Sequence, residues 1–176
     1  MKSPITLMLS PEREHRMTFF DLELLLSEIS NREGFYVVAA NEEVLRKAGI
    51  YERLLLEVFV GSPTNEWPLA VISGLLARAN RRRLRAAGNP LPSRRGPFFL
   101  YRGVAGAPPR RRVRGFSWTD SIESAKRFAT RIPNLRDPAV YRVRVEAAAV
   151  LAYVGGEEAE YLVLLPPTAR PVRVDD

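Results

Sequence analysis

Three short segments, in a fixed order, carry residues suited to phosphate, ribose and cation chemistry. Tyr101-Arg102-Gly103 closes an apolar run, and arginine offers a rigid fork of N–H donors that fits phosphate or ribose oxygens. Phe116-Ser117-Trp118-Thr119 places two hydroxyl groups on either side of an indole. Glu158-Ala159-Glu160 opens a second apolar run. If that backbone is extended, both carboxylates project to the same side, because residues i and i+2 of a strand share a face.

Each segment alone is also typical of ordinary structure. Gly103 would allow a ligand or another backbone to approach closely. Hydroxyl residues before a helix are typical of an N-terminal capping segment, and an acidic pair before a strand is typical of a solvated turn. Phe116 and Trp118 either stack on a ligand or pack in the core. The ordered combination, each part on or beside a predicted strand, is what favours a functional site.

This ordered set resembles the ADP-ribosyltransferase family, in the branch with an Arg–Ser–Glu triad and a Glu-x-Glu motif. The matching segments are YRG (101–103), FSWT (116–119) with the following AKRFA (125–129), and EAEYLVLLP (158–166). The resemblance covers about residues 97–175 and does not extend to residues 1–95. Two features depart from the family pattern: the short interval between Arg102 and Ser117, and the tryptophan at the centre of a motif that is often Ser-Thr-Ser. Both bear on how nicotinamide would pack.

The resemblance implies roles for individual residues. NAD, the co-substrate, would bind in a cleft between two small antiparallel sheets. Arg102 would hold the pyrophosphate or the nicotinamide ribose, and Ser117 would position the ribose and Glu160. Glu160 would bind the ribose 2′-hydroxyl and stabilise the cationic sugar that forms as nicotinamide leaves. Glu158 would orient or deprotonate the acceptor, whereas Glu157 is expected to be solvated. The remaining expected NAD contacts are Tyr101, Gly103, Phe116, Trp118 and Thr119.

The function that the resemblance implies is transfer of a single ADP-ribose from NAD to a macromolecule. A protein side chain, notably arginine, is the favoured acceptor, because family members that modify arginine tend to carry glutamate at the position of Glu158. Three alternatives stay open: a nucleic-acid acceptor, hydrolysis of NAD by water, and a non-catalytic basic module that binds nucleic acid. The expected setting is bacterial or phage, as a toxin-like enzyme, a host modifier or a regulatory enzyme.

Apolar spacing predicts a helical first half. Helices are expected over residues 18–30, 42–48, 50–60 and 69–87, with 35–39 as a short strand or buried link. Asn41 is a candidate N-cap, and Gly49 would end the helix that follows it. The Pro- and Gly-rich segment 88–97 then ends the helical part.

The second half shows strand periodicity. Strands are predicted at 98–104, 116–119 and 139–145, and in the segments VLAYV, EYLVLL and PVRV. One helix is expected over 121–131, with Asp120 and Glu123 as a capping box. The predicted fold is α+β: a helical N-terminal region, residues 1–95, packed in one compact unit with an ADP-ribosyltransferase-like core, residues 96–176. Residues 1–95 would act as a recognition element, a docking surface for an inhibitor or host partner, or a scaffold.

Charge is concentrated in the middle of the chain. The net charge is +7, yet residues 66–145 carry 18 basic and 4 acidic side chains. Such a segment attracts phosphate-bearing partners. Two arginine clusters are either solvated surfaces or contacts for nucleic acid, NAD phosphates or the acceptor: Arg78, Arg81, Arg82, Arg83 and Arg85, and Arg110, Arg111, Arg112 and Arg114.

Composition excludes several classes of chemistry. The chain has no cysteine and one histidine, His15, so it offers no thiolate nucleophile, no Ser–His triad and no basis for a metal site. No apolar run approaches the roughly 20 residues of a membrane span, and the N-terminus lacks an apolar signal region. The sequence therefore predicts a soluble, cytoplasmic protein without membrane partners.

Overall fold

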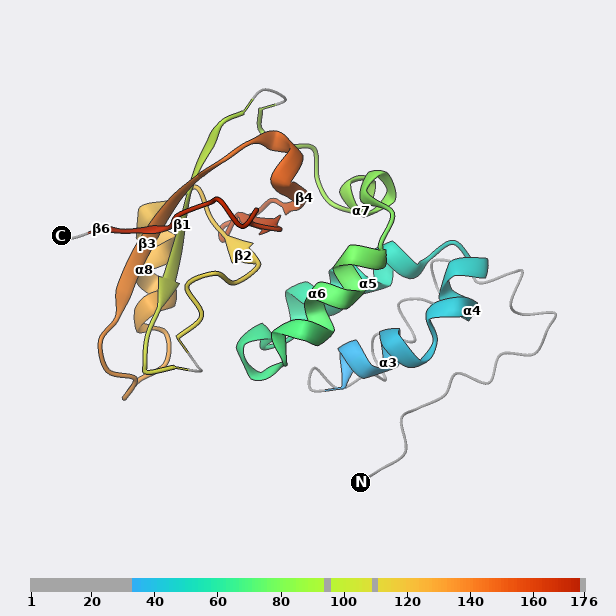
Figure 1. Cartoon of the computed structure of the whole chain (residues 1–176), viewed down its shortest axis with the longest axis horizontal. Coiled ribbons are helices and arrows are strands. Elements are labelled where there is room, and N and C mark those ends of the chain that lie inside the picture. Colours follow the sequence, from blue (N-terminus) through green and yellow to red (C-terminus); the bar gives the residue numbers. More distant parts are fainter. Residues whose placement is uncertain (1–32, 94–95, 109–110, 175–176) are drawn as a thin grey trace. The chain divides into compact units, whose positions relative to one another are not determined.

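The computed structural model describes residues 33–93, 96–108 and 111–174 (Figure 1). The chain divides into two compact units, Met1–Ala87 and Gly88–Asp176. The sequence predicted this boundary after residue 95, which is later in the chain than the boundary in the structure. The helix predicted over residues 18–30 and the lone histidine, His15, lie outside the described residues.

The described part of the first unit is built from helices. Its elements are α3 (Gly34–Ala40), α4 (Glu42–Lys47), α5 (Tyr51–Gly61), the short 3-10 helix η1 (Thr64–Glu66), α6 (Leu69–Arg78) and α7 (Arg81–Ala87). Apolar side chains from most of them form a buried core: Phe35, Val38, Leu45, Leu54, Leu55, Ile72, Leu75 and Leu84. No helix among the described residues is long and apolar enough to cross a membrane.

Two predictions for this unit need correction. Residues 35–39 belong to helix α3 and form neither a strand nor a link. The single helix predicted over 69–87 is two helices, because Ala79 adopts an extended backbone. Asn80 then caps α7, its Oδ1 accepting a hydrogen bond of 3.1 Å from the Arg83 N–H. The apolar stripe hides this break, since Leu84 of α7 is as buried as the core residues of α6.

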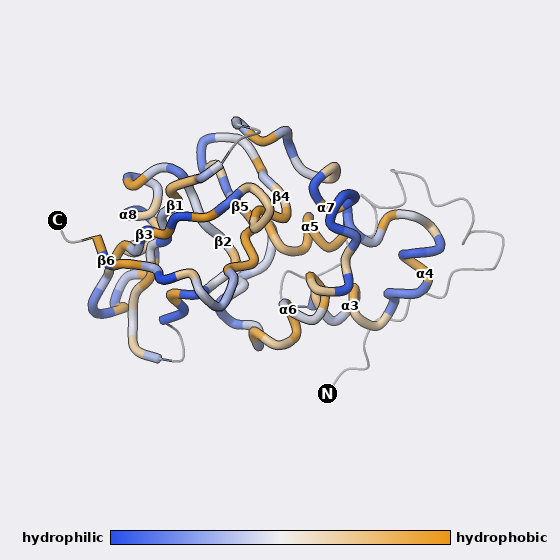
Figure 2. Tube along the Cα trace, turned by 45° about the horizontal axis from the view of Figure 1, so that its top comes forward, coloured by the Kyte–Doolittle hydropathy of each residue, from blue (hydrophilic) through white to orange (hydrophobic). Residues whose placement is uncertain are grey.

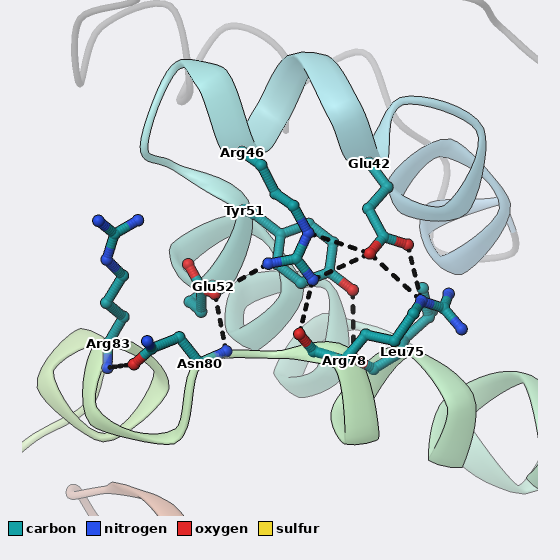
Figure 3. Close-up of polar contacts among 8 residues, drawn as sticks. All are labelled: Glu42, Arg46, Tyr51, Glu52, Leu75, Arg78, Asn80 and Arg83. Carbon is teal, nitrogen blue, oxygen red and sulfur yellow. Dashed lines mark hydrogen bonds and ion pairs between the residues drawn. The ribbon is translucent and has the colours of Figure 1, made fainter.

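A polar network ties α4 to α5 and to the end of α6 (Figure 3). Arg46 donates to Glu42 at 2.9 Å and to the backbone oxygen of Arg78 at 2.7 Å. Glu52 is almost fully buried; it accepts a hydrogen bond of 2.9 Å from the Asn80 N–H and lies 3.6 Å from Arg46. These partners offset the cost of removing the Glu52 carboxylate from water.

The second unit contains two three-stranded sheets whose strand pairs are all antiparallel. The first sheet has the order β1-β3-β6, formed by β1 (Phe98–Val104), β3 (Ala139–Val145) and β6 (Val172–Val174). The second has the order β2-β5-β4, formed by β2 (Ser117–Trp118), β5 (Glu160–Val163) and β4 (Val150–Val154). The remaining elements are α8 (Ile122–Thr130) and the 3-10 helix η2 (Ala147–Ala149). The α+β prediction, with two small antiparallel sheets, is confirmed.

Strand β1 presents two different faces. Its inner face carries Phe98 and Leu100 into a core shared with Trp118 and Tyr161 of the second sheet. Its outer face meets α8, which lies against β1 and β3 in Figure 1. A Cβ on Gly103 would stand 1.9 Å from the backbone oxygen of a residue in α8, so glycine is needed there for strand and helix to touch.

Helix α8 is capped differently from the prediction. The N-cap is Ser121, whose Oγ accepts a hydrogen bond of 3.1 Å from the Ser124 N–H. Asp120 instead accepts a hydrogen bond of 2.9 Å from the hydroxyl of Tyr161 in β5. Because both residues favour caps, the choice between them depends on the tyrosine in a distant part of the chain.

Candidate functional site

Three strands bring together the arginine, the serine and the second glutamate singled out in the sequence. Arg102 lies on the inner face of β1, Ser117 is the first residue of β2 and Glu160 is the first residue of β5. In the β2–β5 pair, Ser117 is opposite Leu162, two residues after Glu160. Ser117 and Glu160 therefore project from the same face of this sheet.

Hydrogen bonds connect the three residues. The Arg102 guanidinium donates through Nη1 to the backbone oxygen of Ser117 at 2.6 Å and through Nε to that of Arg112 at 2.9 Å. The Ser117 hydroxyl in turn hydrogen-bonds the Glu160 carboxylate. Arg102 thus fixes the backbone position from which Ser117 reaches Glu160.

Gly115 makes room for this arrangement and is a residue that sequence reasoning missed. A Cβ at this position would lie 2.4 Å from Cζ of the Arg102 guanidinium, so any other residue would displace it. The sequence signal was a glycine directly before the serine motif, which indicates close packing against another group.

Burial shapes the electrostatics of the pair formed by Arg102 and Glu160. Burial lowers the pKa of Arg102 to about 10, while the charge of Glu160 raises it and that of Arg112 lowers it; Arg102 remains a cation at neutral pH. Burial also raises the pKa of Glu160 above its usual value. The Ser117 hydroxyl and the Arg102 cation oppose that rise, and the negative charge of Glu158 adds to it. Glu160 is therefore a partly desolvated carboxylate held beside a fixed cation.

Glu158 does not lie on the strand. β5 begins at Glu160, and Glu158 lies with Glu157 in the exposed turn before it. The turn follows Gly156, whose φ of 132° is a conformation that favours glycine. The expected strand spacing of the two acids is thus wrong, although Glu158 is close enough to influence the pKa of Glu160. Glu157 is exposed.

The aromatic residues of the serine motif are packed in the protein. The Trp118 side chain is 1% exposed, and its Nε1–H donates to the backbone oxygen of Gly115 at 2.9 Å. Phe116 is buried as well. Of the two possibilities that the sequence left open, both rings therefore pack in the core, and neither is presented for stacking on nicotinamide.

The other expected NAD contacts also serve the fold. Thr119 is buried, and its Oγ1 accepts a hydrogen bond of 3.2 Å from the Ser121 N–H, next to the start of α8. Tyr101 and Gly103 alternate with Arg102 along β1, so they belong to the outer face of the sheet, away from the Arg102 guanidinium. Of the expected set, only Arg102, Ser117 and Glu160 converge, with Glu158 beside them.

The arginines after β1 hold their own loop in place. Arg111 forms an ion pair with Asp137 and donates to the Tyr141 hydroxyl at 3.4 Å. Arg114 donates to two backbone oxygens between β5 and β6, that of Ala169 at 2.6 Å and that of Pro166 at 2.9 Å. Arg110 lies outside the described residues. These contacts support a structural role for Arg111 and Arg114.

The basic cluster of the first unit is more exposed. Arg78 donates to Glu42 at 2.9 Å, whereas the four arginines of α7 lie on the surface of a hydrophilic helix (Figure 2): Arg81, Arg82, Arg83 and Arg85. The expectation of a solvated basic face describes α7, and no aromatic residue is part of that helix.

Comparisons with models of protein families, with curated proteins and with solved structures find no significant match to this chain. Within the described ranges, no group of three or more His, Asp or Glu side chains could hold a metal ion. The chemistry of the site therefore has to be inferred from Arg102, Ser117 and Glu160 themselves.

Proposed function

We propose that this protein is an NAD-dependent mono-ADP-ribosyltransferase. The observation that carries the proposal is the convergence of Arg102, Ser117 and Glu160 from three strands of two small antiparallel sheets. These residues are far apart in the sequence, and a resemblance based only on their order did not require them to meet. NAD is the expected co-substrate.

Glu160 has the properties needed at the reacting carbon of NAD. As nicotinamide leaves, the bond between its ring nitrogen and ribose C1′ breaks, the electron pair goes to nicotinamide, and positive charge develops on the sugar. In the ground state the positive charge lies on the nicotinamide ring, and in the transition state it moves to the sugar. A carboxylate fixed in a partly desolvated position beside the sugar therefore stabilises the transition state more than the ground state. Glu160 is half-buried, so its carboxylate is held by the fold and still open to a ligand.

Ser117 and Arg102 act by positioning Glu160. The Ser117 hydroxyl hydrogen-bonds the carboxylate and so fixes its orientation. Arg102 binds the Ser117 backbone oxygen, and its positive charge favours the ionised form of Glu160. In this geometry the Arg102 guanidinium is directed to backbone oxygens, which gives it a positioning role in place of the expected direct hold on NAD.

The acceptor completes the reaction by attacking C1′ with a nucleophilic atom and losing a proton. Glu158, exposed and close to Glu160, is placed to receive that proton or to orient a cationic acceptor. A protein side chain, with arginine first, is the acceptor that this acid favours electrostatically. Water in the same position would make the protein an NAD glycohydrolase.

Incubation of the full chain with NAD and cell lysate tests the proposal. Release of nicotinamide and labelling of an acceptor are expected, and Glu160→Gln should lower the rate by about 10²–10³. Glu157→Gln is the matched control, since it removes an exposed carboxylate from the neighbouring turn. Mass spectrometry of the labelled product identifies the acceptor, and free ADP-ribose formed without lysate would indicate hydrolysis. The proposal fails if wild-type protein releases no nicotinamide, or if Glu160→Gln retains the full rate.

A further inference from the structure

The outer face of the β1-β3-β6 sheet carries a cross-strand set of aromatic and basic residues. Phe99 of β1 is directly opposite Arg144 of β3, and Tyr101 is directly opposite Arg142. On the other side of β3, Arg142 is opposite Val172 of β6. Residues opposite one another in an antiparallel pair share a face. We call these five residues the aromatic–arginine face.

This face is open to solvent in the structure. Phe99 is 54% exposed and Val172 is 61% exposed, although apolar strand residues are usually buried. Arg142 and Arg144 are exposed too, and Tyr101 is half-buried. Helix α8 packs against this side of the sheet at Gly103, while Phe99, near the other end of β1, stays exposed. Exposed apolar and aromatic residues that share one face of a sheet, instead of lying singly on the surface, indicate an interaction surface.

The charge of this side of the sheet is mostly positive. Arg144 pairs with Glu146 at 2.9 Å, but both side chains are more than half exposed. An ion pair between two exposed side chains contributes little to stability, so the arginine can exchange its partner for another anion. Helix α8 and its C-cap, Arg131, add three exposed cations and one exposed acid on the same side of the sheet: Lys126, Arg127, Arg131 and Glu123.

We propose that the aromatic–arginine face binds single-stranded nucleic acid. Two aromatic rings at alternate positions of β1 lie about 7 Å apart along the strand, so each can stack on its own base. Arginines on the neighbouring strand lie within reach of the backbone phosphates between those bases. Aromatic rings on the open face of a sheet, with cations beside them, are one established way in which sheets recognise unpaired bases.

The surface is independent of the proposed catalytic residues. Alternation along β1 places Arg102 on the inner face of the sheet, whereas Phe99 and Tyr101 belong to the outer face. Nucleic-acid binding here therefore neither requires nor excludes NAD turnover. The arginines of α7 form a second basic surface, but that helix has no aromatic residue and offers no platform for bases.

Fluorescence anisotropy with the full chain tests the proposal. The probes are fluorescein-labelled oligouridine and oligothymidine of about a dozen nucleotides, within the range of site sizes for small binding domains, and a duplex of mixed sequence. The single strands should bind more tightly than the duplex. Phe99→Ala should weaken binding about tenfold or more, in line with the loss of one stacked base. Arg144→Ala should reduce the slope of log K against log salt by about 0.7, as expected for one lost phosphate contact on a single strand.

Matched variants distinguish this surface from general charge and hydrophobicity. Ile132→Ala removes an apolar side chain that is 57% exposed elsewhere in the same unit, and Arg82→Ala removes an exposed cation of α7. Both, and Glu160→Gln, should leave binding unchanged. Thermal unfolding of the Phe99→Ala and Arg144→Ala variants should match wild type, because both side chains are exposed. The proposal is overturned by an absence of binding at physiological salt, by equal binding of duplex, or by unaltered binding after Phe99→Ala.

Discussion

Glu160 is held where its charge is disfavoured. Its carboxylate is partly desolvated and lies near a second acid, and both effects raise its pKa. Only the Ser117 hydroxyl and the Arg102 cation counteract them. Such opposition is typical of residues that act on a developing charge, since a carboxylate in water would be stabilised by solvent before the reaction begins.

The influence of Glu158 on Glu160 predicts a pH effect. Replacing Glu158 by glutamine removes a negative charge that raises the pKa of Glu160, so Glu160 should ionise at lower pH. Nicotinamide release without acceptor, measured against pH, should then lose activity at a lower pH than wild type does. Glu157→Gln is the control. An acid limb that stays in place in Glu158→Gln would show that the two carboxylates do not interact.

The residues of the site illustrate what sequence can and cannot predict. The chemical types of Arg102, Ser117 and Glu160, and their places on strands, could be read from the sequence because strand periodicity is local. The burial of Trp118 could not, since an aromatic residue beside a candidate site fits both stacking and core packing. Its position depends on how the second sheet packs on Phe98 and Leu100, a non-local contact.

At the scale of elements, the close approach of α8 to β1 depends on Gly103 having no side-chain carbon. The backbone oxygen of Ala125 and the backbone nitrogen of Ala129 would lie 1.9 Å and 2.5 Å from a Cβ on Gly103. Neither backbone atom can move without shifting the helix. The conformation of Gly103 therefore matters less than its lack of a side chain.

Gly103→Ala is expected to destabilise the second unit. Overpacking of this kind costs about 1–3 kcal/mol, which corresponds to a loss of roughly 2–12 °C in Tm for a chain of this size. Thermal unfolding followed by near-UV circular dichroism measures the change. Gly155→Ala is the control, because its Cβ would make only ordinary contacts, the nearest atom lying 3.6 Å away. Equal Tm values for the two variants would contradict the packing role.

Helix breaks and strand starts were the least predictable elements. The apolar stripe of α6 resumes at Leu84 beyond the break at Ala79 and Asn80, so the periodicity does not mark the end of α6. The break is stabilised by Glu52, which accepts the Asn80 N–H from another helix. Likewise, Glu158 fits strand alternation, yet the turn after Gly156 delays the strand until Glu160. Both boundaries depend on partners or dihedral angles that alternation does not report.

At the scale of the whole molecule, the basic middle of the chain is divided between the two units. Arg78 pairs with Glu42, Arg111 pairs with Asp137, and Arg114 binds backbone oxygens. Charges that are close in sequence are thus used separately in the two units. The net charge of +7 describes long-range attraction to anions but does not locate a binding site.

Glu42 of the first unit and Glu160 of the second are expected to make opposite contributions to the response of their units to acid. Burial alone would raise the pKa of Glu42, but hydrogen bonds and charges from Arg46 and Arg78 lower it overall from 4.5. Its stabilising contribution is present above that value and lost as pH falls through the folded-state pKa. Glu160 has a raised pKa, so its contribution is complete below 4.5 and lost as pH rises through the folded-state pKa.

Each unit contains one tryptophan, which allows both to be followed in the unmodified protein. Trp67 is buried in the first unit and Trp118 in the second. Indole N–H signals recorded by NMR during heating, at about pH 7 and about pH 4, should show that acid lowers the midpoint more at Trp67 than at Trp118. In Glu42→Gln the acid sensitivity at Trp67 should diminish, because the paired carboxylate is gone, while the signal of Trp118 is unaffected. Parallel falls at both indoles in wild type would show that these two carboxylates do not govern the acid stability of their units.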